Sequence, residues 1–459
     1  MKNVLRRNIR TLMIVFSVMF AGLALYLGGV VVIYGERWFV TPYNPRIQQV
    51  ESNVKPGDLM DRTGQKLLYT KGDERVYVND KSMRKAVSHI IGDSYGMTYG
   101  AQTMFAKYLY GFDQDDISRI LGLVTGEERR GGDVKLTIDA ELCETARAAL
   151  GDNDGAVVVM NYKTGEIVAS ASSPTFDPAD MDIFLEGGGE SELVNRAFTG
   201  LYPPGSTFKL ITAAALIENG LQGFETTCSG STEIDGQSIA CTGEHGAENL
   251  EEAISHSCNV YFAEAAQQLG KDRLASEANK FLFNSDLMYK DVLMGESVFE
   301  TADTGTNLGW SAIGQYHDLI TPLHACMIAA CIANDGVMME PKLLRSVTYG
   351  EAQTYTLAPS VAARPLSDTT LLKDMMVNAV KNGTGKKAAI KGVTVGGKTG
   401  TAEIAGENGN EEHAWFVGFI KDEAHPLAIA VVVEKAGSGG SHAAPAAKKV
   451  LGKAIDLGY

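Results

Sequence analysis

The feature that most constrains the fold of this 459-residue chain is an uncharged segment close to its N-terminus. Residues 11–35, TLMIVFSVMFAGLALYLGGVVVIYG, contain no charged side chain. As a helix, such a segment is about 38 Å long, which is enough to cross a hydrocarbon core of about 30 Å. The segment therefore predicts a single transmembrane helix.

The charges before this segment predict its orientation. Four basic side chains precede it: Lys2, Arg6, Arg7 and Arg10. The positive-inside rule then makes residues 1–10 a cytoplasmic tail and places the chain after Glu36 outside the cell membrane. A cleaved signal peptide is the alternative, but its apolar core is usually shorter and precedes a small-residue cleavage site, which is missing here. We therefore predict a single-pass, uncleaved anchor over residues 11–35.

The composition is that of a folded, acidic protein. Hydrophobic residues make up 45% of the chain and charged residues 21%, both ordinary values for a globular protein. The formal net charge is −15. Because nucleic-acid binding needs clustered basic residues, this charge argues against a nucleic-acid partner.

The six cysteines lead to two expectations. Cys228 and Cys241 bracket a turn-rich loop that a disulfide could close in an oxidising compartment, and two free thiols are the alternative. The other four lie in apolar, helix-like contexts and are predicted to be small core residues: Cys143, Cys258, Cys326 and Cys331. Neither Cys-x-x-Cys nor His-Glu-x-x-His occurs, so the sequence predicts no metal site and no cofactor.

Strand and helix patterns predict the architecture. Residues 36–132 are polar and mixed and indicate a small module or stalk. Beyond them, residues 155–173 form a β-rich hairpin pattern, a long helical stretch comes next, and strands return in residues 392–435 before a last helix. We expect an α+β fold, in which helices flank an antiparallel sheet completed by sequence-distant hairpins and interrupted by a helical insert.

One motif places two reactive side chains at the start of an apolar helix. In LYPPGSTFKL, Ser206 and Lys209 are three residues apart, so they share a helix face. Ser-x-x-Lys also occurs at Ser52/Lys55 and at Ser82/Lys85. The tetrad is therefore not specific by itself, and its meaning depends on the motifs nearer the C-terminus.

Two further motifs come after it in order. Ser257-Cys258-Asn259, in a helical region, is the only Ser-x-Asn in the chain. Lys398-Thr399-Gly400, followed by Thr401, lies on a strand-like run. A second Lys-Thr-Gly at residues 163–165 fills a turn and precedes the serine, so we interpret it as part of a hairpin. Each triplet is weak alone, and the ordered set is specific.

This ordered set resembles the motifs of the class B penicillin-binding proteins, which are membrane-anchored peptidoglycan D,D-transpeptidases. Other segments are also similar to that family: NPR and DRTG in the first module, and AIGQ, IANDG, NGTG and HAWFVGF later. The resemblance implies a fold like that of the serine β-lactamases and transpeptidases. It further implies an N-terminal pedestal module over residues 36–132 and a transpeptidase domain over residues 133–459.

The resemblance also implies roles for the first two motifs. Ser206 would form an acyl-enzyme with the stem peptide, releasing D-Ala, and β-lactams such as penicillin would acylate it too. Since no histidine lies near Ser206, Lys209 is the candidate base, provided that burial and a positive neighbour lower its pKa. Ser257 would relay the proton to the leaving amine, and Asn259 would bind the donor peptide and help to hold Lys209.

The third motif would bind the substrate. Lys398, Thr399, Gly400 and Thr401 would face the terminal carboxylate of a D-Ala-D-Ala stem. By resemblance, the backbone N–H groups of Ser206 and Thr401 form the oxyanion hole.

Other functions stay open on the sequence alone. A β-lactamase-like hydrolase of class A would need a Glu-x-x-Leu-Asn element, which is missing between Asn259 and Lys398. A D,D-carboxypeptidase, which passes the acyl group to water, is not separated by any short motif. A non-enzymatic penicillin sensor would need a signalling domain inside the cell, where only about ten residues are predicted, and the intact set of motifs argues against a catalytically inactive scaffold. For an anchored transpeptidase, the resemblance implies a membrane glycosyltransferase partner of the shape-elongation-division-sporulation type.

Overall fold

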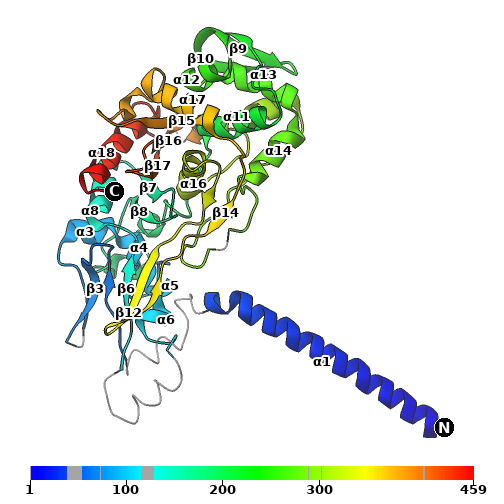
Figure 1. The fold of residues 1–459 in the computed structure, drawn as a ribbon, viewed down its shortest axis with the longest axis vertical. Helices are drawn as coiled ribbons and strands as arrows, with labels where there is room; N and C mark the ends of the chain where they lie inside the picture. The colour runs from blue at the N-terminus through cyan, green and yellow to red at the C-terminus, as the bar shows by residue number, and fades with distance from the viewer. Residues whose placement is uncertain are drawn as a thin grey trace.

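The computed structural model describes residues 2–38, 54–72, 74–114, 129–287, 289–300, 302–406 and 409–459. A long N-terminal helix, α1 (Lys2–Trp38), contains the uncharged segment (Figure 1). Its Arg6–Val30 portion is long and apolar enough to cross a membrane, as expected for an anchor. The NPR motif at residues 44–46 lies outside the described residues.

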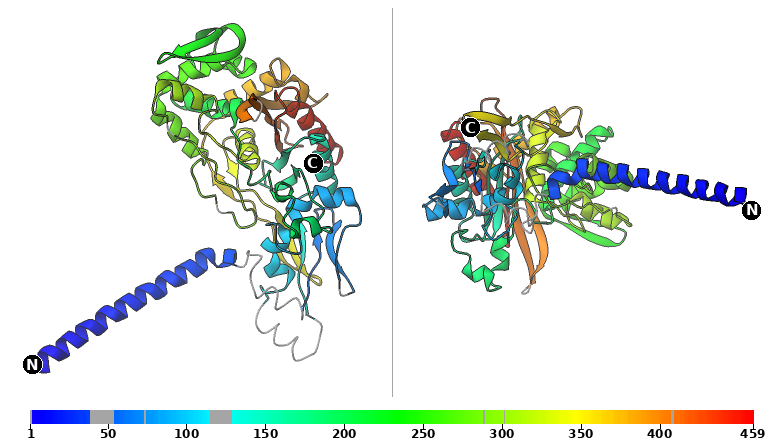
Figure 2. Two further views of the ribbon diagram at one scale, coloured as in Figure 1. Left: turned by 180° about the vertical axis from the view of Figure 1, so that it is seen from behind. Right: turned by 90° about the horizontal axis from the view of Figure 1, so that it is seen from below.

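The main sheet is antiparallel, with the strand order β15-β16-β17-β7-β8 (Figures 1 and 2). Its strands are β7 (Gly155–Asn161), β8 (Ile167–Ser173), β15 (Val395–Gly406), β16 (Gly409–Ile420) and β17 (Leu427–Val433). β7 pairs with β17 over its whole length, from Gly155 opposite Val433 to Asn161 opposite Leu427. Hairpins from distant parts of the chain therefore complete one sheet, which confirms the predicted α+β fold.

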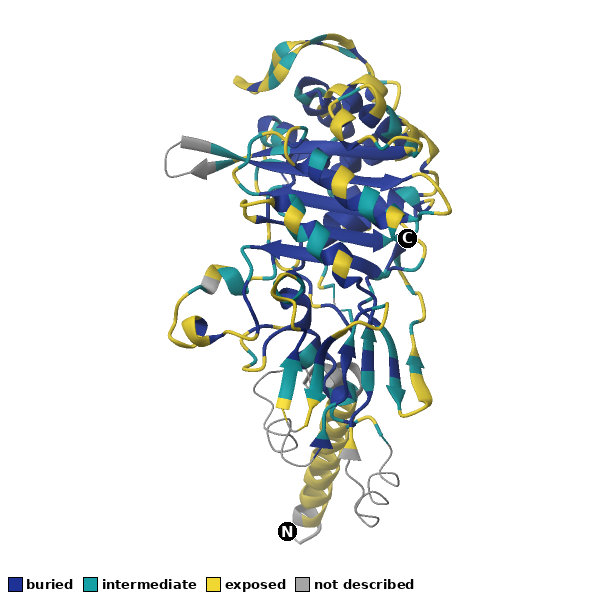
Figure 3. Cartoon of the chain, turned by 90° about the vertical axis from the view of Figure 1, so that its left-hand side faces the viewer, coloured by how far each residue is buried: buried dark blue, intermediate teal, exposed yellow. Residues whose placement is uncertain are grey.

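Helices cover both faces of this sheet. Figure 3 shows its strands buried along most of their length, which explains why β7 and β17 are nearly continuous apolar runs without alternation. β8 is equally buried but includes three serines. Helices α8 (Ala140–Leu150) and α18 (Ala443–Asp456) pack against one face, and α16 (Pro322–Ala333) against the other. Because α16 is apolar all round, it forms the centre of the core.

Most of the chain between β8 and β15 is a helical insert that carries a long hairpin. The helices are α11 (Lys209–Glu218), α12 (Leu250–His256), α13 (Asn259–Leu269), α14 (Lys271–Lys280), α15 (Gly305–Ala312) and α17 (Thr370–Lys381). The hairpin, β9 (Thr226–Ile234) and β10 (Gln237–Glu248), lies at the end of the molecule opposite the strands β3, β6 and β12 (Figures 1 and 2). Its turn has positive φ at Asp235 and Gly236, as tight hairpin turns require. The expectation of a loop in this segment was wrong.

Cys228 and Cys241 are free thiols, so the alternative that the sequence left open holds and the two do not form a disulfide. In the β9–β10 hairpin, Cys228 lies opposite Gly246, so the two cysteines are not cross-strand partners. The four cysteines predicted to be small core residues are buried, as expected.

A second sheet has the strand order β13-β12-β6-β2-β3-β4. Its strands are β2 (Leu59–Met60), β3 (Lys66–Lys71), β4 (Glu74–Tyr77), β6 (Asp133–Leu136), β12 (Leu344–Tyr349) and β13 (Ala352–Thr356). β6 lies between β2, which is parallel to it, and β12, which is antiparallel. Strands from residues 344–356 thus complete a sheet that begins near the N-terminus.

Short elements complete the described fold. Two small strand pairs are β1 (Val54–Lys55) with β5 (Arg129–Arg130), and β11 (Met338–Met339) with β14 (Val361–Ala363). The short helices are α3 (Lys81–Ala86), α4 (Ser88–Ile91), α5 (Ala101–Met104), α6 (Ala106–Leu109), α9 (Asp182–Leu185), α10 (Glu190–Leu193), η1 (Gly205–Thr207) and η2 (Lys386–Ala388).

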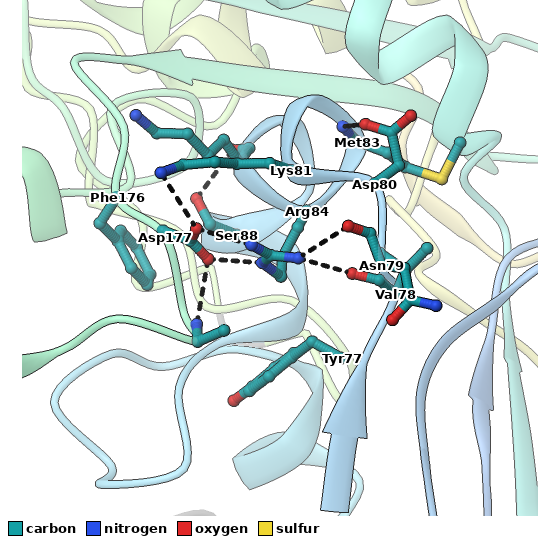
Figure 4. Close-up of polar contacts among 12 residues, drawn as sticks. Tyr77, Val78, Asn79, Asp80, Lys81, Met83, Arg84, Ser88, Phe176 and Asp177 are labelled. Carbon is teal, nitrogen blue, oxygen red and sulfur yellow. Dashed lines mark hydrogen bonds and ion pairs between the residues drawn. The ribbon is translucent and has the colours of Figure 1, made fainter.

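A bidentate ion pair joins the N-terminal region to the segment that follows β8 of the main sheet (Figure 4). Arg84 on α3 donates to both carboxylate oxygens of Asp177, at 2.5 and 2.8 Å, and to the carbonyl oxygen of Val78 at 2.8 Å. The two charged side chains are only 14% and 9% exposed. The hydrogen bond from Arg84 lowers the pKa of Asp177. This bidentate contact ties α3 to the segment that follows β8.

Candidate active site

Gly205 packs the turn that carries Ser206 against two other segments of the chain, at Thr401 and at Gly314. Gly205 has φ +52°, and a Cβ there would lie 2.6 Å from the carbonyl oxygen of Thr401. Its N–H donates to the carbonyl oxygen of Gly314 at 2.8 Å. A side chain at Gly205 would therefore push η1 away from β15. Ser206 follows at the centre of η1 and is half-buried.

Lys209 is the first residue of α11 and has no exposed surface. Its Nζ donates to the carbonyl oxygen of Ser257 and to Asn259 Oδ1, both at 2.6 Å, and lies 3.3 Å from Ser257 Oγ. Burial lowers the pKa of Lys209 to about 8. A substantial share of this lysine is therefore neutral near pH 8.

The Ser-x-Asn motif lies at the junction of two helices, which corrects the expectation of one continuous helical region. Ser257 ends α12 in the left-handed conformation, with φ 61° and ψ 39°, and Asn259 begins α13. Such a conformation is strained for a serine and persists only where the surroundings hold it. Asn259 Nδ2 donates to the carbonyl oxygen of Ala240 on β10 at 2.9 Å, which turns its Oδ1 toward Lys209.

Lys398 brings the third motif to the same point. It is fully buried on β15, and its Nζ donates to Ser257 Oγ at 2.7 Å and to the carbonyl oxygen of Thr399 at 2.9 Å. Burial, and next the charge of Lys209, lower the pKa of Lys398 well below its usual value. One hydroxyl thus lies between two buried amines.

The residues after Lys398 follow the edge strand of the main sheet. Thr399 Oγ1 donates to Thr384 Oγ1 at 2.7 Å. Gly400 is packed so closely that a Cβ would lie 2.9 Å from the Thr207 side chain and 3.0 Å from that of Trp415. Thr401 is half-buried beside Gly205. This part of β15 therefore lies directly against the turn that carries Ser206.

The sequence analysis missed several residues that support this arrangement. Trp415 Nε1 donates to the carbonyl oxygen of Pro203 at 3.1 Å, which fixes the chain just before Ser206. Thr384 holds Thr399, and the β10 backbone at Ala240 orients Asn259. In the sequence, Thr384 belongs to the NGTG segment. That segment resembles the family, but the resemblance gives Thr384 no role. No local pattern marks Ala240, since its role comes from the hairpin.

The three motifs converge, although they are far apart in the sequence. Hydrogen bonds link Lys209 and Lys398 to the Ser257–Asn259 turn, and Ser206 lies three residues before Lys209. The Thr399–Thr401 segment continues along the strand that packs against Ser206's turn. A serine three residues before a buried, hydrogen-bonded lysine, at the start of a helix, suits a Ser–Lys acyl-transfer site.

Comparisons with known proteins agree with this class of site. The protein-family model 'Penicillin binding protein transpeptidase domain' matches residues 155–452 of this chain. Peptidoglycan D,D-transpeptidase PbpA from Mycolicibacterium smegmatis is 32% identical over 457 residues, covering 91% of this chain and 92% of that protein. Penicillin-binding protein A from M. tuberculosis, solved as a ceftriaxone acyl-enzyme complex, is 30% identical with a TM-score of 0.80, covering 88% of this chain and 99% of that one.

A structure from another organism has the same fold. The D,D-transpeptidase domain of a peptidoglycan glycosyltransferase from Eggerthella lenta is 29% identical, with a TM-score of 0.77 over 88% of this chain and 99% of that domain. The chain belongs to the penicillin-binding protein transpeptidase family, and its architecture fits class B.

Proposed function

We propose that this chain is a peptidoglycan D,D-transpeptidase that cross-links stem peptides through an acyl-enzyme on Ser206. The observation that carries the proposal is the buried amine of Lys209, which lies three residues after Ser206 in the sequence. Ser257 and Asn259 hold this amine by hydrogen bonds, and its pKa is lowered. Family membership and the acyl-enzyme complexes of a 30% identical relative support it.

In acylation, Ser206 Oγ attacks the carbonyl carbon of the penultimate D-Ala, and its proton passes to neutral Lys209. Backbone N–H groups of Ser206 and Thr401 stabilise the oxyanion. The C–N bond then breaks, and the leaving D-Ala amine receives a proton through Ser257. Contact of Ser257 Oγ with both Lys209 and Lys398 supports this relay.

In the second step an amine of a neighbouring stem attacks the ester carbonyl. That amine loses a proton to the site, the ester C–O bond breaks, and Ser206 regains its hydroxyl. Before acylation, Lys398, with Thr399, Gly400 and Thr401, binds the donor's terminal carboxylate, because its buried amine and the neighbouring hydroxyl groups can donate hydrogen bonds to an anion. Penicillin acylates the same serine because its lactam carbonyl occupies the same oxyanion hole.

The same proposal includes the location and organisation of the chain. Residues 1–10 are cytoplasmic, α1 crosses the membrane once, and the catalytic unit lies outside. Residues 36–132 form a pedestal for the transpeptidase domain of residues 133–459. A membrane glycosyltransferase of the shape-elongation-division-sporulation type supplies the glycan strands that this chain cross-links. The apolar length of Arg6–Val30 and the basic side chains before it support the anchor and its orientation.

Labelling with a fluorescent penicillin tests the assignment. Wild-type chain should be labelled, Ser206→Ala should carry no label, and Lys209→Ala should be acylated roughly a thousandfold more slowly. Ser82→Ala and Lys85→Ala are matched controls, because they change another Ser-x-x-Lys that lies outside the site. Label that persists in Ser206→Ala would reject the proposal.

The acceptor separates transpeptidation from hydrolysis. With a D-Ala-D-Ala peptide and an added acceptor amine, the products should include the cross-linked peptide, and the hydrolysed one should be the minor product. A product mixture that does not change when the amine is added would favour a D,D-carboxypeptidase. Rapid release of penicillin from wild type would favour a β-lactamase-like hydrolase.

A further inference from the structure

We propose that Cys228, Cys241, His245 and Cys258 form a tetrahedral zinc site next to the Ser-x-Asn turn. Each residue offers one ligand atom, and these atoms all lie within 4.8 Å of one another. Cys228 comes from β9, Cys241 and His245 from β10, and Cys258 from the residue that caps α13. The hairpin and the helix junction thus meet at one cluster.

The distances fit a metal better than a disulfide. Cys241 Sγ lies 3.9 Å from Cys258 Sγ and 3.7 Å from His245 Nδ1. Zinc–sulfur bonds of about 2.3 Å in a tetrahedron separate two sulfurs by about 3.8 Å. A disulfide needs sulfurs about 2.05 Å apart. These two separations therefore already match the edges of a zinc tetrahedron, and all four ligand atoms lie within 4.8 Å of one another.

Neighbouring groups suit thiolate ligands. The backbone N–H of Asn259 donates to Cys241 Sγ at 3.2 Å, and that of Tyr261 donates to Cys258 Sγ at 3.4 Å. Such donors stabilise negative sulfur. The thiol of Cys228 donates to the carbonyl oxygen of Gly243 at 3.5 Å, a weak bond that metal ligation would replace.

The histidine ligand is also held from outside the cluster. The ring of His245 stacks on that of His256, with centroids 5.3 Å apart. His256 Nδ1 is in turn 2.7 Å from Oε1 of Glu248, whose side chain is fully buried. Because Glu248 holds His256 in place, the stacked ring restricts the orientation of the His245 imidazole.

The ligand set favours zinc and a structural role. Three thiolates and one imidazole in a closed tetrahedron match structural zinc sites, and soft sulfur ligands disfavour magnesium and calcium. The expectation that the chain has no metal site rested on short motifs. That test could not detect this cluster, because only Cys241 and His245 are close in the sequence.

The position of Cys258 gives the metal a further consequence, which rests on the proposed function. Cys258 lies between Ser257 and Asn259, the two residues that hold Lys209. Ser257 has a strained left-handed conformation that its surroundings must maintain. A metal bound to Cys258 and to the hairpin fixes this turn and so positions Lys209.

Metal content of the full-length chain tests the site. Chain purified in detergent, with reducing agent and without chelator, should contain about one zinc per molecule by mass spectrometry. Cys228→Ala and His245→Ala should lose most of it, whereas His245→Cys should retain it, because four thiolates also bind zinc. Cys331→Ala, which removes a buried cysteine outside the cluster, is the matched control and should keep its zinc.

Cobalt binding tests the site in the wild-type chain alone, so the result does not depend on whether the variants fold. Wild-type chain loaded with Co²⁺ should show thiolate-to-cobalt charge-transfer bands and the strong visible bands of tetrahedral cobalt. Fully reduced wild type that takes up neither metal would overturn the site, as would full zinc content in both Cys228→Ala and His245→Ala. Penicillin labelling of zinc-free wild type would reject the positioning step, and zinc binding without any label on Ser206 would reject only the proposed function.

Discussion

Lys209 illustrates how burial makes the neutral form of a lysine accessible while hydrogen bonds orient its amine. Its two shortest contacts, at 2.6 Å, are to the carbonyl oxygen of Ser257 and to Asn259 Oδ1, and both oxygens only accept. A neutral amine has two hydrogens to donate and one lone pair. The two oxygens use both hydrogens, which leaves the lone pair available to accept a proton.

The pKa of about 8 predicts the pH dependence of acylation. Only the neutral amine can act as a base, so the acylation rate constant should rise with pH and level off above about pH 9. At about pH 6 it should be roughly a hundredfold below that plateau, because about 1% of Lys209 is then neutral. Stopped-flow measurement with a chromogenic β-lactam gives this profile. Lys209→Arg should stay inactive throughout, since a guanidinium does not deprotonate, and a flat profile in wild type would contradict the assigned base.

Among the elements, the short helix η1 depends on its contact with β15. Gly205→Ala adds a methyl group 2.6 Å from the carbonyl oxygen of Thr401 at a residue with φ +52°. The strained backbone should lower the free energy of unfolding by about 1–2 kcal/mol. The clash should also move Ser206 and slow penicillin acylation at least about tenfold.

A matched glycine separates these two effects. Gly220, just beyond the end of α11, has φ +72°, and a Cβ there would meet nothing within 4 Å. Gly220→Ala should therefore show only the loss of stability that backbone strain causes, measured by urea unfolding, and an unchanged acylation rate. Equal acylation rates in the two variants would mean that the η1–β15 contact does not position Ser206.

Local patterns are sufficient to predict some elements and insufficient for others, for a physical reason. Apolar runs such as Gly155–Asn161 predict the main sheet, because both faces of these strands are buried. The Asp235-Gly236 turn does mark the hairpin, yet the alternating polar residues of β9 and β10 also suit a loop. Convergence of Cys228 with Cys258 depends on where that hairpin folds back, which no local pattern contains.

The second sheet shows the same limit for the whole molecule. β6 pairs with β2 on one side and with β12 on the other, so distant segments share one sheet. Strand pairing between such segments depends on the complete fold and leaves little signal in either strand alone. The N-terminal region is therefore attached to the rest by strand pairing as well as by the ion pair between Arg84 and Asp177.

That ion pair predicts how firmly the two regions are joined. Arg84→Ala leaves the carboxylate of Asp177 buried without its bidentate partner, so the free energy of unfolding should fall by about 2–3 kcal/mol near neutral pH. Arg84 lowers the pKa of Asp177, so this stabilisation is present above the ordinary pKa of an aspartate and is lost as the pH falls through the lowered one. Lys81, 67% exposed and 4.0 Å from the same carboxylate, is the matched control, and Lys81→Ala should change stability by less than about 0.5 kcal/mol. Urea unfolding at neutral and acidic pH measures both variants, and equal effects of the two substitutions would show that the buried geometry of Arg84 adds nothing to the junction.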